Sequence, residues 1–217
     1  MTKPVLVIGN KAYSSWSLRP WLLMRHAQID FEEVRLPLYT ETWNANISRY
    51  SPTGKVPALI DGEVRIWDSL AICEYLAEKY PEKHLWPQER AARALARAVS
   101  AEMHSGFRDL RSSMAMNVRR SLPGQGRTAE TMRDVARVKT LWNDCRTRFG
   151  GHGAFLFGAF SIADTMYAPV ASRFRTYAVE LDPVCQAYVE TIHSLPSMQR
   201  WVAEANAETE VIAQYET

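Results

Sequence analysis

The sequence of 217 residues lacks a strong excess of either charge, and it has no long apolar run. Its 26 lysines and arginines nearly balance its 24 aspartates and glutamates, which leaves a formal net charge of +2 at pH 7. Nucleic acid and anionic membranes are therefore not expected as main partners. No stretch approaches the roughly 20 apolar residues that a membrane-spanning helix needs. The apolar run at residues 5–8 is also too short for a secretory signal.

Cysteine is scarce and histidine is scattered. The three cysteines, Cys73, Cys145 and Cys185, have an odd count and no paired spacing. This argues against a disulfide framework and favours a reducing, cytoplasmic location. The five histidines show no metal-ligand spacing with each other or with cysteine, so we expect no structural metal. Apolar residues at 47% and charged residues at 23% are ordinary values for a globular protein of one large domain or two small ones.

The first 81 residues alternate strand and helix signals. Strands are expected at residues 5–8, 31–36, 58–60 and 64–67, and helices at 17–28, 43–50 and from 69 onward. Asp61-Gly62 is a strong hairpin signal between the last two strands, because glycine accepts the positive φ of such turns. The predicted order is βαβαββα. The first two strands should be parallel through a right-handed crossover.

Beyond this region strand signals fade, and we expect an all-helical second domain at 89–217 after a linker at 82–88. One long helix is expected from residue 89 to about 120. Thr128 should cap a second helix that reaches about residue 149. Ser161-Ile162-Ala163-Asp164 resembles a capping box that opens a third helix, to about 179, and we interpret it as structural. Two shorter helices follow Asp182 and residue 194.

Chemistry is first suggested by Tyr13-Ser14-Ser15-Trp16-Ser17, which follows the first strand where a helix begins. The start of a helix offers unpaired N–H groups and a partial positive charge, which suit an anion such as a thiolate. The alternative is that the serines merely cap the helix, a common use of this residue. Two further motifs follow. Gly54-Lys55-Val56-Pro57 is a proline-containing loop, and Asp68-Ser69 precedes another helix.

With these motifs in this order, the chain resembles the cytosolic glutathione transferases, most closely the serine-type zeta branch that includes maleylacetoacetate isomerases. The resemblance covers nearly the whole length. It implies an α/β plus all-α fold, with a thioredoxin-like N-terminal domain and an all-helical C-terminal domain. It further implies a cytoplasmic homodimer that uses glutathione as co-substrate. Serine at the active turn, where thioredoxins carry a cysteine pair, disfavours a thiol–disulfide oxidoreductase.

The resemblance assigns roles to the glutathione site. Ser14 would activate the thiol by hydrogen bonding to its sulfur, and Ser15 is the alternative. The bond between Val56 and Pro57 would be cis, with the backbone of Val56 pairing with the ligand. Asp68 and Ser69 would bind the γ-glutamyl group of glutathione. Lys55 would contact its glycyl carboxylate. Each of these roles has a structural alternative. Pro57 would be an ordinary trans proline, Asp68-Ser69 an ordinary helix cap, and Lys55 a solvated surface lysine.

An acceptor pocket is expected between the domains, where the long helix faces Trp16. Its residues would be Trp16, Met103, His104, Phe107 and Arg108. Trp16 departs from the cysteine that zeta relatives usually carry, and a large indole would narrow the pocket. An isomerase of maleylacetoacetate needs cations there, and the candidates are Arg108, Arg111, Arg173 and Arg175.

Two classes of function therefore stay open. The first is an enzyme that activates glutathione as a thiolate and adds it to a small electrophile, or isomerises a substrate by reversible thiol addition. The second is a non-catalytic glutathione-transferase-fold module that serves in stress response or protein interaction. The motifs of the glutathione site favour the enzyme. The change at Trp16 keeps the second class in play.

Overall fold

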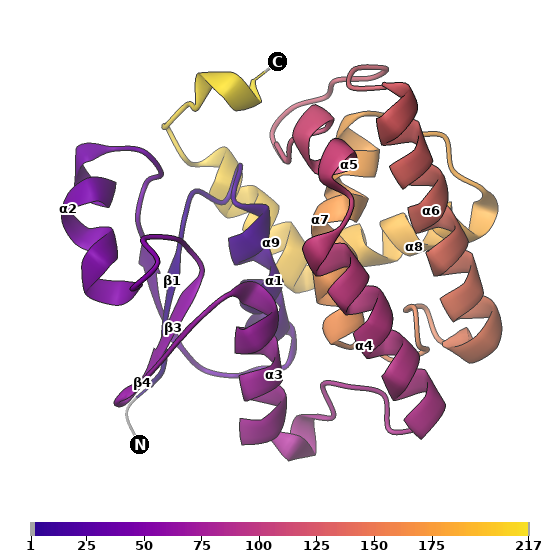
Figure 1. The fold of residues 1–217 in the computed structure, drawn as a ribbon, viewed down its shortest axis with the longest axis horizontal. Coiled ribbons are helices and arrows are strands. Elements are labelled where there is room, and N and C mark those ends of the chain that lie inside the picture. Colours follow the sequence, from indigo (N-terminus) through magenta and orange to yellow (C-terminus); the bar gives the residue numbers. More distant parts are fainter. Residues whose placement is uncertain (1–2, 217) are drawn as a thin grey trace.

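The computed structural model describes residues 3–216, which form a small sheet flanked by helices on one side of the molecule and a helical half on the other (Figure 1). The N-terminal elements are β1 (Val5–Ile8), α1 (Ser15–His26), β2 (Glu32–Arg35), α2 (Glu41–Tyr50), β3 (Ala58–Asp61), β4 (Val64–Trp67) and α3 (Ser69–Lys79). The predicted order of strands and helices is confirmed. The sheet order is β2-β1-β3-β4, and β1 and β2 are parallel as expected.

The hairpin between β3 and β4 turns one residue later than predicted. Asp61 pairs with Val64 in the ladder, so the two-residue turn is Gly62-Glu63 rather than Asp61-Gly62. Gly62 has φ +61, the left-handed region that glycine adopts at little cost. Asp61 is held in the strand by its side chain, which accepts a hydrogen bond from Tyr75 Oη at 2.7 Å and pairs with Lys79.

The second half contains six α-helices among the described residues: α4 (Arg90–Ser105), α5 (Arg108–Ser113), α6 (Ala129–Cys145), α7 (Ile162–Thr176), α8 (Pro183–Ser194) and α9 (Pro196–Asn206). A 3₁₀ turn at Pro81–Lys83 precedes them, and a π-helical turn at Arg146–Gly150 extends α6. Two helix caps predicted from the sequence are confirmed. Thr128 Oγ1 accepts a hydrogen bond from Thr131 N at 3.1 Å, and Ser161 and Asp164 form the expected capping box.

The prediction of one helix from residue 89 to about 120 is wrong, because α4 ends at Ser105. Phe107 has φ +55, a left-handed conformation that ends a helix and turns its ring into the core. Gly106 allows the close approach at this end, since a Cβ there would lie 2.7 Å from the carbonyl oxygen of Glu102. Apolar spacing continues through Leu110 and Met114 because both side chains are buried, although the helix is interrupted.

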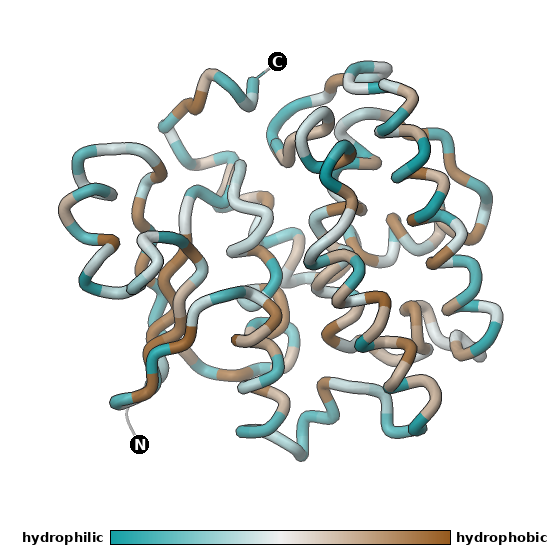
Figure 2. Tube along the Cα trace, viewed as in Figure 1, coloured by the Kyte–Doolittle hydropathy of each residue, from teal (hydrophilic) through white to brown (hydrophobic). Residues whose placement is uncertain are grey.

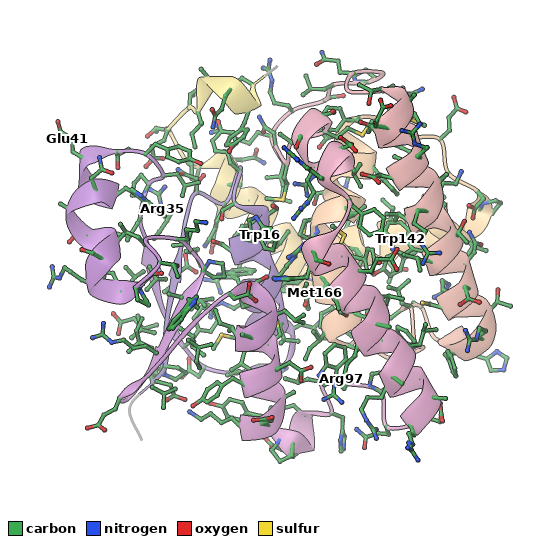
Figure 3. All side chains as sticks on the ribbon, viewed as in Figure 1. Trp16, Arg35, Glu41, Arg97, Trp142 and Met166 are labelled. Atoms are coloured by element: carbon green, nitrogen blue, oxygen red, sulfur yellow. The ribbon has the colours of Figure 1, made fainter. Side chains whose placement is uncertain are left out.

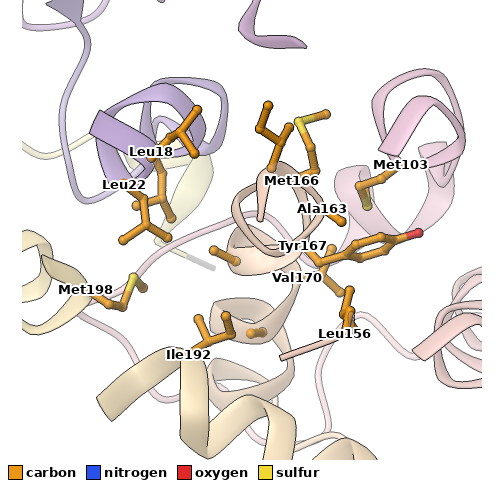
Figure 4. Packing of buried hydrophobic residues seen from close by; sticks show 14 of the residues in the cluster. Leu18, Leu22, Met103, Leu156, Ala163, Met166, Tyr167, Val170, Ile192 and Met198 are labelled. Carbon is orange, nitrogen blue, oxygen red and sulfur yellow. The ribbon is translucent and has the colours of Figure 1, made fainter. Parts of the chain in front are cut away.

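The core is built around α7, whose residues are nearly all buried. The helices α1, α4 and α8 pack against it, so α7 joins the two halves of the molecule. Figure 4 shows the side chains that gather there, which include Leu18, Leu22, Met103, Leu156, Ile192 and Met198. Strands β1 and β3 are also largely hydrophobic along the trace in Figure 2. No helix among residues 3–216 is both long enough and apolar enough to cross a membrane.

Candidate functional site

A cavity of about 540 Å³ lies where the N-terminal domain faces α5 and α7. A second cavity, of about 370 Å³, shares Trp16, Lys55 and Val56 with it. Figure 3 shows Trp16 near the middle of the molecule, between the two halves. The two cavities together are lined by every residue predicted for the glutathione site: Ser14, Ser15, Lys55, Val56, Pro57, Asp68 and Ser69. Local motifs that are separate in sequence therefore meet at one place.

The predicted acceptor residues separate into two groups. Trp16 and Arg108 line the larger cavity. Met103 and Phe107 do not, because both are buried in the hydrophobic core, with 1% and 7% of their surface exposed. Their assignment to the pocket is thus corrected: helical spacing identified apolar residues in α4 and just after it, and these side chains pack inward. His104 lies behind the pocket wall, where its ring meets the Trp16 ring edge-on at 5.3 Å between centroids.

Ser14 occupies the N-cap position of α1, yet its side chain makes no capping hydrogen bond. Its hydroxyl instead lies 2.7 Å from Ser17 Oγ, which also accepts a hydrogen bond from Gly9 N at 3.1 Å. Ser14 is the donor of this bond, so its hydroxyl would serve an anion in the cavity only by rotating away from Ser17, as hydroxyl groups can. The first-turn N–H groups of α1 also stay without a side-chain cap from Ser14, as an anion site requires.

Ser15, the alternative activating residue, faces a cation. Its hydroxyl accepts a hydrogen bond from Arg173 Nη2 at 3.4 Å. The Arg173 guanidinium is fixed by the carbonyl groups of Met114 and Pro169, at 2.7 and 3.1 Å. The structure therefore gives the two serines different surroundings: Ser14 belongs to a hydroxyl pair, and Ser15 to an arginine.

Two arginines lie against the indole of Trp16, and a third lies beside the neighbouring Ser15. Arg19 stacks on the ring at 4.3 Å and donates a hydrogen bond to Ser69 Oγ at 3.2 Å. Arg111 lies 5.4 Å from the same ring, and Arg173 lies beside Ser15. Burial, together with the neighbouring arginines, lowers the pKa of Arg19 to about 9 and that of Arg173 to about 10. Burial also lowers the pKa of Arg111. This wall of concentrated positive charge suits an anionic ligand.

Asp68 has two structural duties in addition to lining the smaller cavity. Its Oδ1 accepts hydrogen bonds from Leu70 N and Ala71 N, at 2.9 and 3.2 Å, and thus caps α3. Its Oδ2 lies 3.0 Å from His104 Nε2, and burial lowers the pKa of that histidine. The neutral imidazole can donate from Nε2 to the carboxylate. Asp68 itself has φ +79, and it stands next to the buried Ser69.

The Val56–Pro57 peptide bond is cis, as the resemblance implied. Sequence reasoning did not identify Arg19, Tyr13, Tyr39 or Tyr215 as site residues. Arg19 carried a signal, since it is a charged residue within the buried apolar face of a helix. Tyr13 belongs to the serine motif, whereas Tyr39 and Tyr215 carried no signal, because they reach the cavity from two other segments. Among residues 3–216 no group of three or more histidine, cysteine, aspartate or glutamate side chains could hold a metal ion.

Comparison with known proteins identifies both halves. Residues 13–79 match the model of the glutathione S-transferase N-terminal domain, and residues 117–204 match that of the C-terminal domain. A probable maleylacetoacetate isomerase from Caenorhabditis elegans is 37% identical over 109 residues, which is 50% of each chain. Glutathione S-transferase Z2 from Arabidopsis thaliana is 26% identical over 92% of this chain and 93% of its own length. The stronger match thus spans about half of that relative's length.

Solved structures share the fold. A glutathione transferase homologue from Burkholderia, crystallised with bound glutathione, has a TM-score of 0.73 at 24% identity and covers 95% of this chain and 100% of its own. A glutathione S-transferase from the Antarctic clam Laternula elliptica has a TM-score of 0.72 at 20% identity, with 96% of each chain covered.

Proposed function

The chain belongs to the glutathione S-transferase family, and on this premise we propose that it binds reduced glutathione, activates it as a thiolate and adds it to a small electrophile. One observation carries the proposal. Ser14 lines the cavity at the start of α1 and makes no side-chain cap there, and its hydroxyl, which donates to Ser17, would reach a sulfur anion by rotating into the cavity.

The energy required is modest. A glutathione thiol that behaves like cysteine has a pKa of about 8.5, and lowering it by about two units takes roughly 2.7 kcal/mol of preferential thiolate stabilisation. A hydroxyl donor and the electropositive end of α1 together supply energy of that order. Catalysis then comes from thiolate stabilisation and proximity, and no protein side chain forms a covalent intermediate.

The proposal is tested by ultraviolet pH titration of glutathione bound to the protein. The bound thiol is expected to ionise about two pKa units below the free thiol. If glutathione does not bind at millimolar concentration, the non-catalytic module is the better description. If it binds but titrates like free glutathione, the enzyme proposal is wrong.

A second candidate is isomerisation of the maleylacetoacetate type, which relatives carry in their names. The thiolate would add to a carbon–carbon double bond, the single bond so formed would rotate, and the thiolate would leave with its electron pair. The cationic wall around Trp16 favours this candidate, because such an acceptor carries two carboxylates. Conjugation and isomerisation share the activated thiolate, and they differ in what the acceptor does next.

The cationic wall also predicts selectivity for acidic acceptors. With 4-chloro-3,5-dinitrobenzoate, the thiolate sulfur bonds to the ring carbon and chloride leaves with the bonding pair. We expect kcat/KM for this acid to exceed that for its methyl ester by about tenfold, equivalent to about 1.4 kcal/mol of ionic attraction. Arg111→Gln should reduce that ratio about threefold or more. Arg97→Gln, at an exposed arginine paired with Glu74, is the matched control. If wild type has the same kcat/KM for the acid and for its methyl ester, selectivity for an anionic acceptor is refuted.

We further propose a homodimer in which the N-terminal domain of one copy meets the helical domain of the other. The open edge of the sheet supports this, since β4 pairs only with β3 among the described residues and exposes Val64 and Trp67. An edge strand with exposed apolar side chains is usually covered. Sedimentation should therefore give twice the chain mass, and a monomer mass at micromolar concentration would contradict it. A cytoplasmic location agrees with the three buried free cysteines and with a reduced co-substrate.

A further inference from the structure

Residues 207–216, which we call the C-terminal segment, turn back after α9 across the N-terminal domain. In Figure 1 they form the yellow stretch above α1 and β1, and they include a 3₁₀ turn at Ala213–Tyr215. This segment was not singled out by any sequence motif. It lies against the turn of residues 10–14, which carries Ser14.

Glu208 binds the backbone of this turn directly. Its two carboxylate oxygens accept hydrogen bonds from Lys11 N at 2.7 Å and from Ala12 N at 3.2 Å. Only 5% of the Glu208 side chain is exposed, so these bonds are shielded from water. Hydrogen bonds from N–H groups to a carboxylate are among the stronger ones in proteins. The carboxylate therefore fixes two successive residues of the turn.

Glu216 holds the next residue. Tyr13 Oη donates to Glu216 Oε1 at 2.6 Å and accepts a hydrogen bond from Ile212 N at 3.3 Å. Arg119 also donates to this hydroxyl, and to the carbonyl groups of Glu208 and Glu210. The segment is thus attached at both ends to the same turn.

The turn transmits this attachment to Ser14. Tyr13 N and Ser14 N both donate to the carbonyl oxygen of Asn10, at 3.2 and 2.8 Å, so residues 10–14 form one hydrogen-bonded unit. The amide of Ser14 and the start of α1 are therefore placed by a turn whose outer N–H groups end on Glu208. A shift of this turn would move the Ser14 hydroxyl relative to the ligand sulfur.

The segment also contributes a wall to the larger cavity. Tyr215 lines it, with its ring centroid 5.6 Å from that of Tyr13. The neighbouring Tyr215 hydroxyl, together with burial, raises the pKa of Tyr39 to about 12. Tyr39 comes from the loop before α2 and is largely exposed, so the two tyrosines meet at the edge of the cavity.

We propose that the C-terminal segment is part of the active site: Glu208 and Glu216 are positioning residues that hold the turn bearing Ser14, and Tyr215 bounds the acceptor side of the cavity. The inference rests on the proposed function, because it assigns the segment a role in thiolate activation and acceptor selection. It adds residues from the far end of the chain to a site otherwise built by the N-terminal domain, α5 and α7.

The test compares Glu208→Gln with Glu210→Gln. Both changes remove one negative charge beside Arg35, but only Glu208 touches the turn. Glutamine keeps the size and one acceptor oxygen, so one N–H group loses its partner. Glu208→Gln should raise the pKa of bound glutathione by about half a unit to one unit and lower turnover at neutral pH about three- to tenfold. The KM for glutathione should stay within about twofold. Glu210→Gln should match wild type.

Two more variants complete the test. Tyr13→Phe keeps the ring but loses the bonds to Glu216 and Ile212, so it should shift the thiol pKa in the same direction even if Glu208→Gln does not fold. Tyr215→Ala should raise KM for chlorodinitrobenzoate about fivefold and leave the thiol pKa unchanged. If Glu208→Gln and Tyr13→Phe titrate like Glu210→Gln while wild type activates glutathione, the positioning role is overturned. If the KM for chlorodinitrobenzoate is unchanged in Tyr215→Ala, Tyr215 does not bound the acceptor side of the cavity. Failure of wild type to lower the thiol pKa overturns the proposed function instead.

Discussion

Replacing Ser14 with alanine is expected to lower the rate of conjugation about eightfold at pH 7. The variant keeps the electropositive end of α1, so the hydroxyl is assigned about 1.5 units of a two-unit depression, and the bound thiol is then about three-quarters ionised in wild type and about 9% ionised in the variant. The deficit should shrink as the pH rises, because both thiols become ionised above about pH 9.5. Rate against pH, measured with saturating glutathione, gives both pKa values directly.

Ser15→Ala is the matched control for this experiment. Ser15 carries the same hydroxyl one residue further along α1, but it accepts a hydrogen bond from Arg173. The pKa of the glutathione thiol bound to Ser15→Ala should stay within about 0.3 units of its value in wild type. Loss of activation in Ser15→Ala with a normal Ser14→Ala would exchange the two roles. A deficit in Ser14→Ala that is equal at all pH values would mean that Ser14 affects geometry and not ionisation.

Replacing Asp164 with alanine is expected to lower the free energy of unfolding by about 4 kcal/mol. The buried carboxylate accepts hydrogen bonds from Leu156 N, Ser161 N, Ser161 Oγ and Tyr188 Oη, at 2.8 to 3.2 Å. Each buried donor left without a partner costs about 1–3 kcal/mol. For a chain of this size, such a loss lowers the melting temperature by about 8–16 °C. Ser161→Ala, which removes one hydroxyl and leaves the carboxylate in place, should cost only about 1 kcal/mol.

The loss in Asp164→Ala should also depend on pH. Burial raises the pKa of Asp164 to about 6, from 3.8. The folded protein therefore binds more protons at this residue than the unfolded chain does between these two values. The proton-linked part of this residue's contribution to stability is fully present below about pH 4 and is lost as the pH rises through 6, whereas the part that comes from its hydrogen-bonded donors remains. The difference in unfolding free energy between wild type and variant should accordingly be larger at pH 5 than at pH 8. Chemical denaturation at both pH values measures it, and a difference that grows with pH would contradict the assignment.

Local features were readable from the sequence because each depends on residues close together in the chain. Thr128 and Ser161 cap helices through bonds that span three residues, and the turn glycine at position 62 needs only its own φ. The βαβαββα order and the parallel pairing of the first two strands followed from apolar patterning and from the handedness of crossovers. The turn was predicted one residue too early because its position depends on contacts that are not local. Asp61 pairs with Val64 in the ladder, and its side chain is bound by Tyr75 and Lys79 of α3.

The ends of long helices and the residues that line a pocket were harder to predict from the sequence. The spacing that predicted one helix through residue 120 describes which side chains are buried, and it is blind to a break such as the one at Phe107. The same spacing placed Met103 in a pocket, although an apolar residue on a helix face more often packs into a core. His104, one residue further along, contacts the wall of the site from behind, through Trp16 and Asp68.

By itself, the sequence determined the order of strands and helices, the caps and the set of small motifs that line the two cavities. These depend on backbone propensities and on contacts within a few residues. Only the tertiary structure decided the arginine wall around Trp16, the different surroundings of Ser14 and Ser15, and the position of Glu208 and Tyr215. Contacts of this kind join residues separated by as many as 203 positions, as between Tyr13 and Glu216. Such pairs leave no pattern in one sequence, because their contact energies are realised only after the core around α7 has brought the two halves together.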